Sequence, residues 1–284
     1  MLPSELLFHI CSFLSTSCPD LAALARVSLS WSAVAHRVLY RHLNVPNHPG
    51  PLLTLANNPV LAALVRSFAV AQHNHPLLSR ALANMSHLVE LDLFLDAPHI
   101  LQNSTDYPLL QRFATSLPWS PLLVQFLHRC PTISQLYLDS PSPDVLSLPP
   151  SFLPALSHFT GPPSLALALI PHRPVQHIDL TLSPNLSPLS LALTPDLALS
   201  LSQSSAPVLA LAATTSSTGH GQPQREDENL VRVLRVLAAC MGHLRHLRVV
   251  TNTYADASTF GEIGVFTDVC LPLSSLTYTL KNTF

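Results

Sequence analysis

The first 45 residues carry apolar positions at the spacing of short amphipathic helices. The segment LPSELLFHICSFLS predicts a helix with Leu6, Ile10, Phe13 and Leu14 along one face and Leu7 and Cys11 beside it. Ser4 is the expected N-cap of this helix, and Asp20 that of a second helix. A third is expected from about Ser30, with apolar positions at residues 31, 34, 35, 38 and 39. Three short helices cannot enclose a large core, so the downstream chain or another protein must cover the first helix.

Beyond residue 46, six-residue strings with apolar residues at positions one, four and six recur. They are VRSFAV from Val65, LVELDL from Leu88, ISQLYL from Ile133, VQHIDL from Val175 and LRHLRV from Leu244, with looser forms LSHFTG from Leu156 and LSSLTY from Leu273. The steps between their first positions are 23, 45, 23, 19, 69 and 29, and the steps of 45 and 69 are close to two and three times 23. Several strings follow helix-like runs. Leucine is frequent enough for one string to arise by chance, but a helix followed by a short strand at this period is typical of leucine-rich repeats.

The pattern predicts an α/β fold in two parts: a three-helix module at residues 1–45 and an irregular leucine-rich-repeat-like solenoid with parallel strands at residues 46–284. The stretch 183–229 has no clear register. Within it, residues 215–228 read as an exposed loop, because small, polar and charged residues are clustered there.

Composition narrows the function. Charged residues make up 11% of the 284 residues, against about 25% in ordinary soluble domains, and the net charge is −2. Nucleic-acid binding is not expected without a basic stripe. No stretch of 18 apolar residues predicts a membrane span, and no basic region precedes the first apolar run as in a signal peptide. The five cysteines form no CxxC pair, which argues against a disulfide scaffold or a common zinc site. The expected location is therefore the cytoplasm or the nucleus.

Candidate catalytic and metal-binding patterns are weak. The closest histidine pairs, His73 with His75 and His243 with His246, lack a clustered carboxylate or cysteine. There is no GxSxG nucleophile motif and no glycine-rich phosphate loop. Cys130 ends a predicted helix, where a repeat buries a small apolar residue. We therefore expect no enzyme activity, no cofactor and no metal. The alternative is a divergent hydrolase in which the fold brings a Ser or Cys, a His and a carboxylate together in a pocket.

The N-terminal segment LPSELLFHICSFLSTSCPDLAALARVSLSWSAVAHRVLYRHL resembles an F-box. The matching positions are Leu2, Pro3, Glu5, Leu6, Leu7, Ile10, Leu14, Asp20, Leu21, Leu24, Val27, Ser28, Trp31, Leu39 and Tyr40. The order and spacing of these residues are more specific than any single string, although the segment ends at Leu43 and covers only a small part of the chain. The leucine-, proline- and serine-rich remainder is similar in texture to F-box-like proteins of mushroom-forming fungi.

This resemblance implies an adaptor of a Skp1-cullin-F-box ubiquitin ligase, in which the F-box docks on a Skp1-like adaptor and through it on a cullin. The implied Skp1-binding residues are Leu2, Pro3, Leu6, Leu7, Ile10, Leu14, Leu21, Leu24, Val27 and Trp31. Trp31 is also expected to pack inside the three-helix module. The repeat region would hold an unknown protein substrate. The alternative is a protein-interaction scaffold whose first helix packs on its own repeats and binds no ligase.

Overall fold

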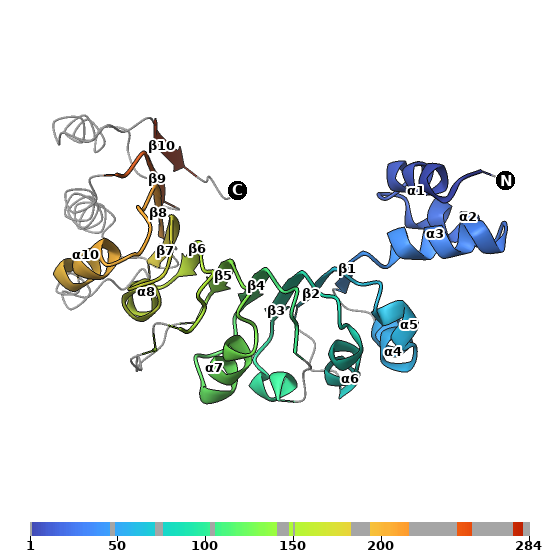
Figure 1. The fold of residues 1–284 in the computed structure, drawn as a ribbon, viewed down its shortest axis with the longest axis horizontal. Helices are drawn as coiled ribbons and strands as arrows, with labels where there is room; N and C mark the ends of the chain where they lie inside the picture. Colours follow the sequence, from blue (N-terminus) through green and yellow to red (C-terminus); the bar gives the residue numbers. More distant parts are fainter. Residues whose placement is uncertain are drawn as a thin grey trace. The chain divides into compact units, whose positions relative to one another are not determined.

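A computed structural model describes residues 2–45, 49–71, 76–102, 106–140, 148–149, 151–182, 194–215, 243–251 and 275–280 (Figure 1). The chain forms two compact units, Met1–Thr132 and Ile133–Phe284. Both are α/β: parallel strands alternate with short helices in each. The predicted loop at 215–228 and the histidines at 73 and 75 lie outside the described residues, except for Thr215 at the end of a strand.

The first unit opens with three helices, α1 (Ser4–Phe13), α2 (Cys18–Leu24) and α3 (Leu29–Leu39). Helix α3 packs against both of the others. The predicted caps need correction. The N-cap of α1 is Pro3 rather than Ser4, and α2 begins at Cys18, so that Asp20 lies in its first turn, where a carboxylate favours the helix dipole. The Ser28 hydroxyl caps α3 by accepting from the Trp31 N–H at 3.4 Å.

The rest of the first unit alternates strands with short helices. Its elements are β1 (His42–Val45), α4 (Pro49–Asn57), α5 (Pro59–Ala62), β2 (Ser67–Ala71), α6 (Pro76–Asn84), β3 (Glu90–Phe94), the 3-10 helix η1 (Pro98–Leu101), β4 (Arg112–Thr115) and α7 (Pro121–His128). Each strand pairs in parallel with the strand before it. Figure 1 shows α4 to α7 on one side of these strands.

The second unit continues the alternation. Its elements are β5 (Gln135–Leu138), β6 (His158–Gly161), α8 (Pro163–Leu169), β7 (His177–Leu182), α10 (Thr194–Ser202), β8 (Ala210–Thr215), β9 (His246–Thr251) and β10 (Ser275–Leu280). Within this unit each strand after β5 pairs in parallel with its predecessor. Helices α8 and α10 pack against each other.

The predicted strings coincide with strands. All seven lie on a strand, and each strand begins at the third residue of its string. In the strings that start between Val65 and Val175, positions one, four and six are buried. Alternating burial of this kind is the pattern of a strand with one face in the core. The hydrophobic period therefore locates the core side of the sheet in both units.

The longest step between strings runs from Val175 to Leu244. At a constant period of 23 residues it would contain two further strands. In the described part of the chain only β8 stands between them in the ladder, because β8 pairs with both β7 and β9. Val208, the first position of the β8 string, falls near the midpoint between Val175 and Leu244. Each step in this part of the chain is thus longer than the steps that precede it.

Several polar side chains form hydrogen bonds to the backbone of the preceding strand-and-helix step. The Tyr107 hydroxyl donates to the backbone carbonyl of residue 82, and the Thr132 hydroxyl donates to that of residue 110, both at 2.9 Å. The Ser157 hydroxyl donates at 3.1 Å to the carbonyl of residue 134. These partners lie 22 to 25 residues earlier in the chain, about one step. The bonds satisfy carbonyls that would otherwise be desolvated without a donor.

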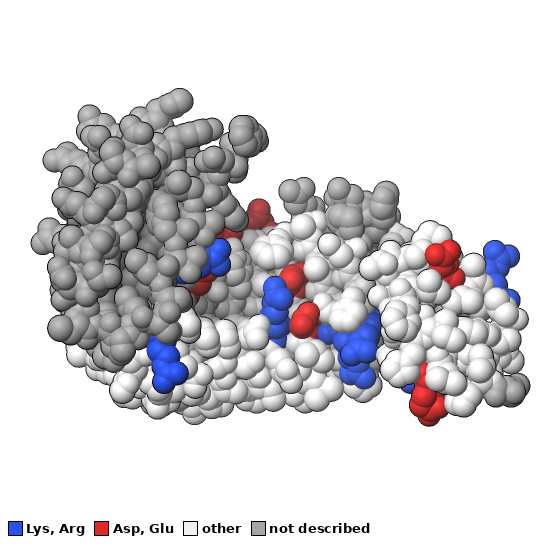
Figure 2. Space-filling model, turned by 90° about the horizontal axis from the view of Figure 1, so that it is seen from above, with Lys and Arg blue, Asp and Glu red and all other residues white. Residues whose placement is uncertain are grey.

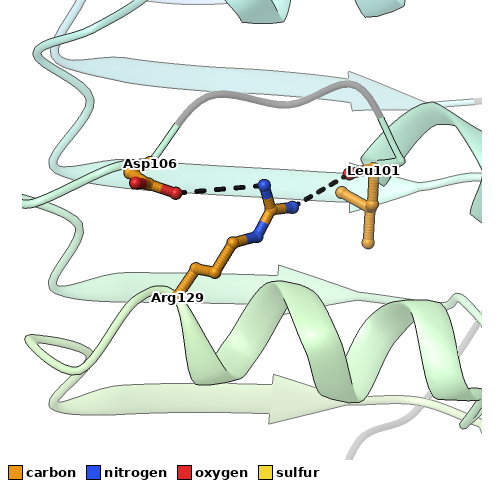
Figure 3. A network of polar contacts seen from close by, with 3 residues as sticks. All are labelled: Leu101, Asp106 and Arg129. Carbon is orange, nitrogen blue, oxygen red and sulfur yellow. Dashed lines mark hydrogen bonds and ion pairs between the residues drawn. The ribbon is translucent and has the colours of Figure 1, made fainter.

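Arg129 makes a further link of this kind, shown in Figure 3. Its guanidinium donates to the Leu101 carbonyl at 3.3 Å and lies 3.9 Å from the Asp106 carboxylate. The Asp106 side chain is 76% exposed, so water screens this ion pair and it contributes at most about 1 kcal/mol. The main role of Arg129 is therefore to connect the end of α7 to the end of η1.

Arg173 is the largest fully buried side chain in the second unit, at 1% exposure. Its Nε donates to the Phe152 carbonyl at 2.6 Å, and Nη2 donates to the Pro149 carbonyl at 3.1 Å. Nη1 donates to the carbonyls of residues 168 and 171, at 3.3 and 3.0 Å. Burial lowers the pKa of Arg173 from its usual value. The guanidinium thus joins the segment before β6 to the end of α8.

Gly161 occupies position six of the β6 string, where most other strings carry a large apolar residue. A Cβ atom there would lie 2.9 Å from the Phe159 ring and 3.0 Å from the Leu138 carbonyl oxygen. We expect Gly161→Ala to lower the free energy of unfolding of the second unit by about 1–3 kcal/mol, because the backbone oxygen cannot move aside cheaply. Urea denaturation checks this. Gly50→Ala is the control, since nothing lies within 4 Å of its Cβ position, and equal effects of the two changes would contradict the prediction.

The rings of His158 and His177 stack on neighbouring strands, with centroids 4.2 Å apart and planes 3° from parallel. Desolvation lowers the pKa of His158, and the adjacent His177 lowers it further. The unfolded chain, in which a histidine pKa is about 6.5, therefore binds more protons than the native one, and stability falls as the pH drops through about 6.5.

We expect the urea midpoint of the second unit to fall between about pH 7.5 and about pH 5.5, and to fall less in His158→Gln. Hydrogen exchange of residues 151–182 in urea measures this unit separately from the first. The same dependence on pH in both proteins would assign the acid sensitivity to other groups.

Candidate partner-binding surface

Helix α1 divides into a buried side and an exposed apolar side. Leu7 and Cys11 point inward, at 4% and 0% exposure. The exposed side carries Leu6, Ile10 and Phe13, with exposures of 49%, 41% and 87%, and Leu2, just before the helix, is 53% exposed. Spacings of three and four residues place side chains on the same side of a helix. An apolar strip along α1 is therefore open to solvent in the described part of the chain, which gives no support to the alternative of a first helix packed on the chain itself.

The inward side of α1 belongs to a small core of its own. Cys11, Leu21 and Ala35 form its centre, one from each helix. Partly buried residues surround it: Leu14, Leu24, Ala25, Trp31, Val34, Val38 and Leu39. Trp31 thus packs against the three-helix core, as expected from the sequence. This core fixes which side of α1 is exposed.

The residues implied as partner contacts fall into three groups. Exposed ones are Leu2, Pro3, Leu6, Ile10 and Val27. Half-buried ones are Leu14, Leu24 and Trp31. Leu7 and Leu21 are buried at 4% and 1% exposure, so in this conformation they offer a partner almost no surface. Both side chains are buried within the helical module.

Two exposed residues were missing from the implied set of contacts. Phe13 is 87% exposed and lies three residues after Ile10 on the same side of α1. Leu29 is 91% exposed at the first position of α3. The spacing of Phe13 could have identified it, because it continues the strip formed by Leu6 and Ile10. Leu29 had no such signal, since its exposure depends on how α3 begins.

Exposed apolar side chains are concentrated in this module. Of the eleven large hydrophobic residues that are exposed among the described residues, six lie between Leu2 and Leu29. Figure 2 shows charged side chains as scattered groups on a largely uncharged surface. Apolar patches on a protein surface mark interaction sites when they are contiguous. The apolar strip, defined here as Leu2, Leu6, Ile10 and Phe13, is therefore the candidate partner-binding surface, and Val27 and Leu29 are further exposed apolar residues of the same module.

The described residues offer little support for a reactive thiol, a metal site or a membrane-spanning helix. Burial raises the pKa of Cys11, and it raises that of Cys130 to about 11, so both thiols are protonated at neutral pH. The described segments hold no group of three His, Cys, Asp or Glu residues arranged to bind a metal ion. None of the helices in those segments combines the length and the apolar character that crossing a bilayer requires.

Comparison with known proteins identifies the helical module. Residues 1–46 match the family model described as F-box-like. The match spans helices α1 to α3 and β1, and so contains the whole apolar strip. A search of curated proteins found no match for the chain. The chain therefore carries an F-box-like domain, and the remaining residues have to be interpreted from their structure.

Proposed function

We propose that this protein is the substrate-recognition adaptor of a Skp1-cullin-F-box ubiquitin ligase. The observation that carries the proposal is the exposed apolar strip on a module that matches the F-box-like family. F-box domains generally bind Skp1, and the strip gives a hydrophobic partner a surface to bury. Burying a side chain such as Leu6 or Ile10 contributes about 1.5–3 kcal/mol before the costs of association. Skp1 would connect the chain to a cullin.

The region after the F-box-like domain is, in this proposal, an irregular leucine-rich-repeat-like solenoid that holds a protein substrate. Three observations support a repeat architecture: parallel pairing of each strand with its predecessor within each unit, strings that begin two residues before their strands, and hydrogen bonds reaching back about one step. Stacked repeats share one core because a single repeat cannot bury its own apolar side. The protein would act by proximity, without catalytic chemistry of its own, in the cytoplasm or nucleus.

Co-expression with Skp1 tests the proposal. The full chain and a tagged Skp1 are purified together, and the complex is measured by size-exclusion chromatography with light scattering. We expect a stable 1:1 complex that also retains a cullin N-terminal domain. A well-folded chain that elutes separately from excess Skp1 would overturn the proposal. It would favour the alternative of a repeat scaffold that uses the apolar strip for another protein.

A further inference from the structure

One face of the sheet in the second unit carries a row of histidines with one gap. The strand register aligns His158, His177, Ala210 and His246 on the adjacent strands β6 to β9. Two positions further along the strands, a second row aligns Thr160, Asp179, Ala212 and Arg248. Residues of both rows line a hollow of about 400 Å³. The hollow therefore lies over the two alanines of β8.

The histidine pair shows how rings pack in this row. His158 and His177 stack at 4.2 Å, close to the spacing of about 4.8 Å between neighbouring strands. Ala210 contributes only a methyl group on the next strand, and His246 follows one strand later. His177 and His246 are therefore about 9.6 Å apart measured across the strands, which is two strand spacings. A flat ring over Ala210 would lie about 4.8 Å from each histidine, within the range of aromatic stacking.

The second row determines the polarity at the edge of this space. Asp179 and Arg248 flank Ala212 on the two neighbouring strands. A carboxylate accepts hydrogen bonds at two oxygens and a guanidinium has five N–H donors, so each has capacity for more than one partner. A group that both donates and accepts suits a position between them. A phenol hydroxyl does this, whereas an aliphatic side chain would leave both the stacking positions and the polar edge unused.

The hollow is open to solvent, as binding sites for side chains at protein interfaces are. His158, His246 and Arg248 are exposed to solvent. Sites for free small molecules usually bury most of the ligand, whereas an open slot receives a side chain that projects from another surface. Tyrosine is enriched at protein interfaces because its ring is apolar and its hydroxyl is polar.

We propose that the slot over Ala210 and Ala212 receives a tyrosine side chain of a protein partner, with the ring between His177 and His246 and the hydroxyl between Asp179 and Arg248. The inference rests on the proposed function, since the partner would be the protein that the repeat region holds. At neutral pH the ring of His158 is neutral, because burial and His177 lower its pKa. The stacked pair forms an aromatic wall next to the slot.

The test measures ring binding to the full chain by saturation-transfer difference NMR, with N-acetyl-tyrosinamide as the probe and N-acetyl-leucinamide as the aliphatic comparison. We expect saturation of the tyrosine ring protons and none of the leucine methyls. Ala210→Leu fills the slot and should remove the signal. Ala69→Leu is the matched control, because Ala69 lies on a β2 strand position between Asn44 and Asp92, without flanking rings, and it should retain the signal.

A signal that persists in Ala210→Leu, or equal binding of the leucine probe, would overturn the proposal. If Ala210→Leu fails to fold by circular dichroism, His246→Ala decides, since that side chain is exposed and its removal deletes one wall. None of these changes lies in the F-box-like domain, so Skp1 capture should be unaffected. A chain that binds the probe but not Skp1 would overturn the proposed function and leave the slot established, and the reverse result would do the opposite.

Discussion

We expect the double substitution Leu6→Asp and Ile10→Asp to abolish capture by Skp1 while the chain stays folded. Both side chains are about half exposed in the free chain, at 49% and 41%, so the change costs the isolated protein little. A bound partner would cover them, and two carboxylates would then be desolvated without a counterion. The lost apolar burial alone corresponds to about 3–6 kcal/mol, or at least a hundredfold in the dissociation constant. Isothermal titration with purified Skp1 measures the difference.

A matched pair of substitutions separates this effect from a general one of charge. Leu53 and Val60 are also exposed, at 51% and 74%, and lie on α4 and α5 outside the F-box-like domain. Leu53→Asp with Val60→Asp adds the same two charges and should leave Skp1 affinity unchanged. Equal losses in both double variants would show that Skp1 does not dock on the apolar strip. Circular dichroism melts confirm that all three proteins are folded.

Arg173→Met has the largest expected effect on stability. The methionine fills much of the same volume but removes the donors to four backbone carbonyls, at residues 149, 152, 168 and 171. Leaving buried acceptors without donors costs about 1–3 kcal/mol each, partly relieved by relaxation and water entry. We expect a loss of about 3–5 kcal/mol in the free energy of unfolding of the second unit.

Hydrogen exchange with mass spectrometry locates this loss. Protection should fall in residues 151–182 and remain in residues 76–102 of the first unit. Arg112→Met is the control, because Arg112 is 50% exposed and pairs with Asp92 only at 3.8 Å, so its loss should cost less than about 1 kcal/mol. If the two variants lose the same amount of protection, the buried carbonyl bonds are not what holds the second unit together.

Hydrophobic spacing predicted the strands of the five regular strings and the two looser ones. It missed β1, because residues 42–45 were assigned to the three-helix module, and it missed β4 and β8, whose strings place Thr115 and Ala213 at position six. Thr115 is fully buried because its hydroxyl donates to the Leu93 carbonyl at 2.9 Å. A polar residue that is satisfied in this way has no hydrophobic signal, so only the neighbouring strands reveal its position.

The candidate surface was predictable in location but not in detail. The period of α1 placed Leu6, Ile10 and Phe13 on one face with Leu7 and Cys11 beside it, but it could not tell which of the two groups the module buries. Packing of Cys11 with Leu21 and Ala35 rotates Leu7 inward and leaves Leu6 exposed. Arg173 was not predictable at all. Its acceptors at residues 149 and 152 belong to the preceding step of the chain, and no local pattern connects them.

The order of strand pairing has a consequence for synthesis of the chain on the ribosome. Within each unit, every strand pairs with the one translated just before it, so each new strand finds its partner already made. Contacts between neighbours in sequence close small loops and form quickly. Domains also tend to fold in order from the N-terminus during translation. The F-box-like helices are complete before the strands that follow them are made, so a Skp1-like adaptor of the kind proposed above could engage a nascent chain while the rest of it is still being synthesised.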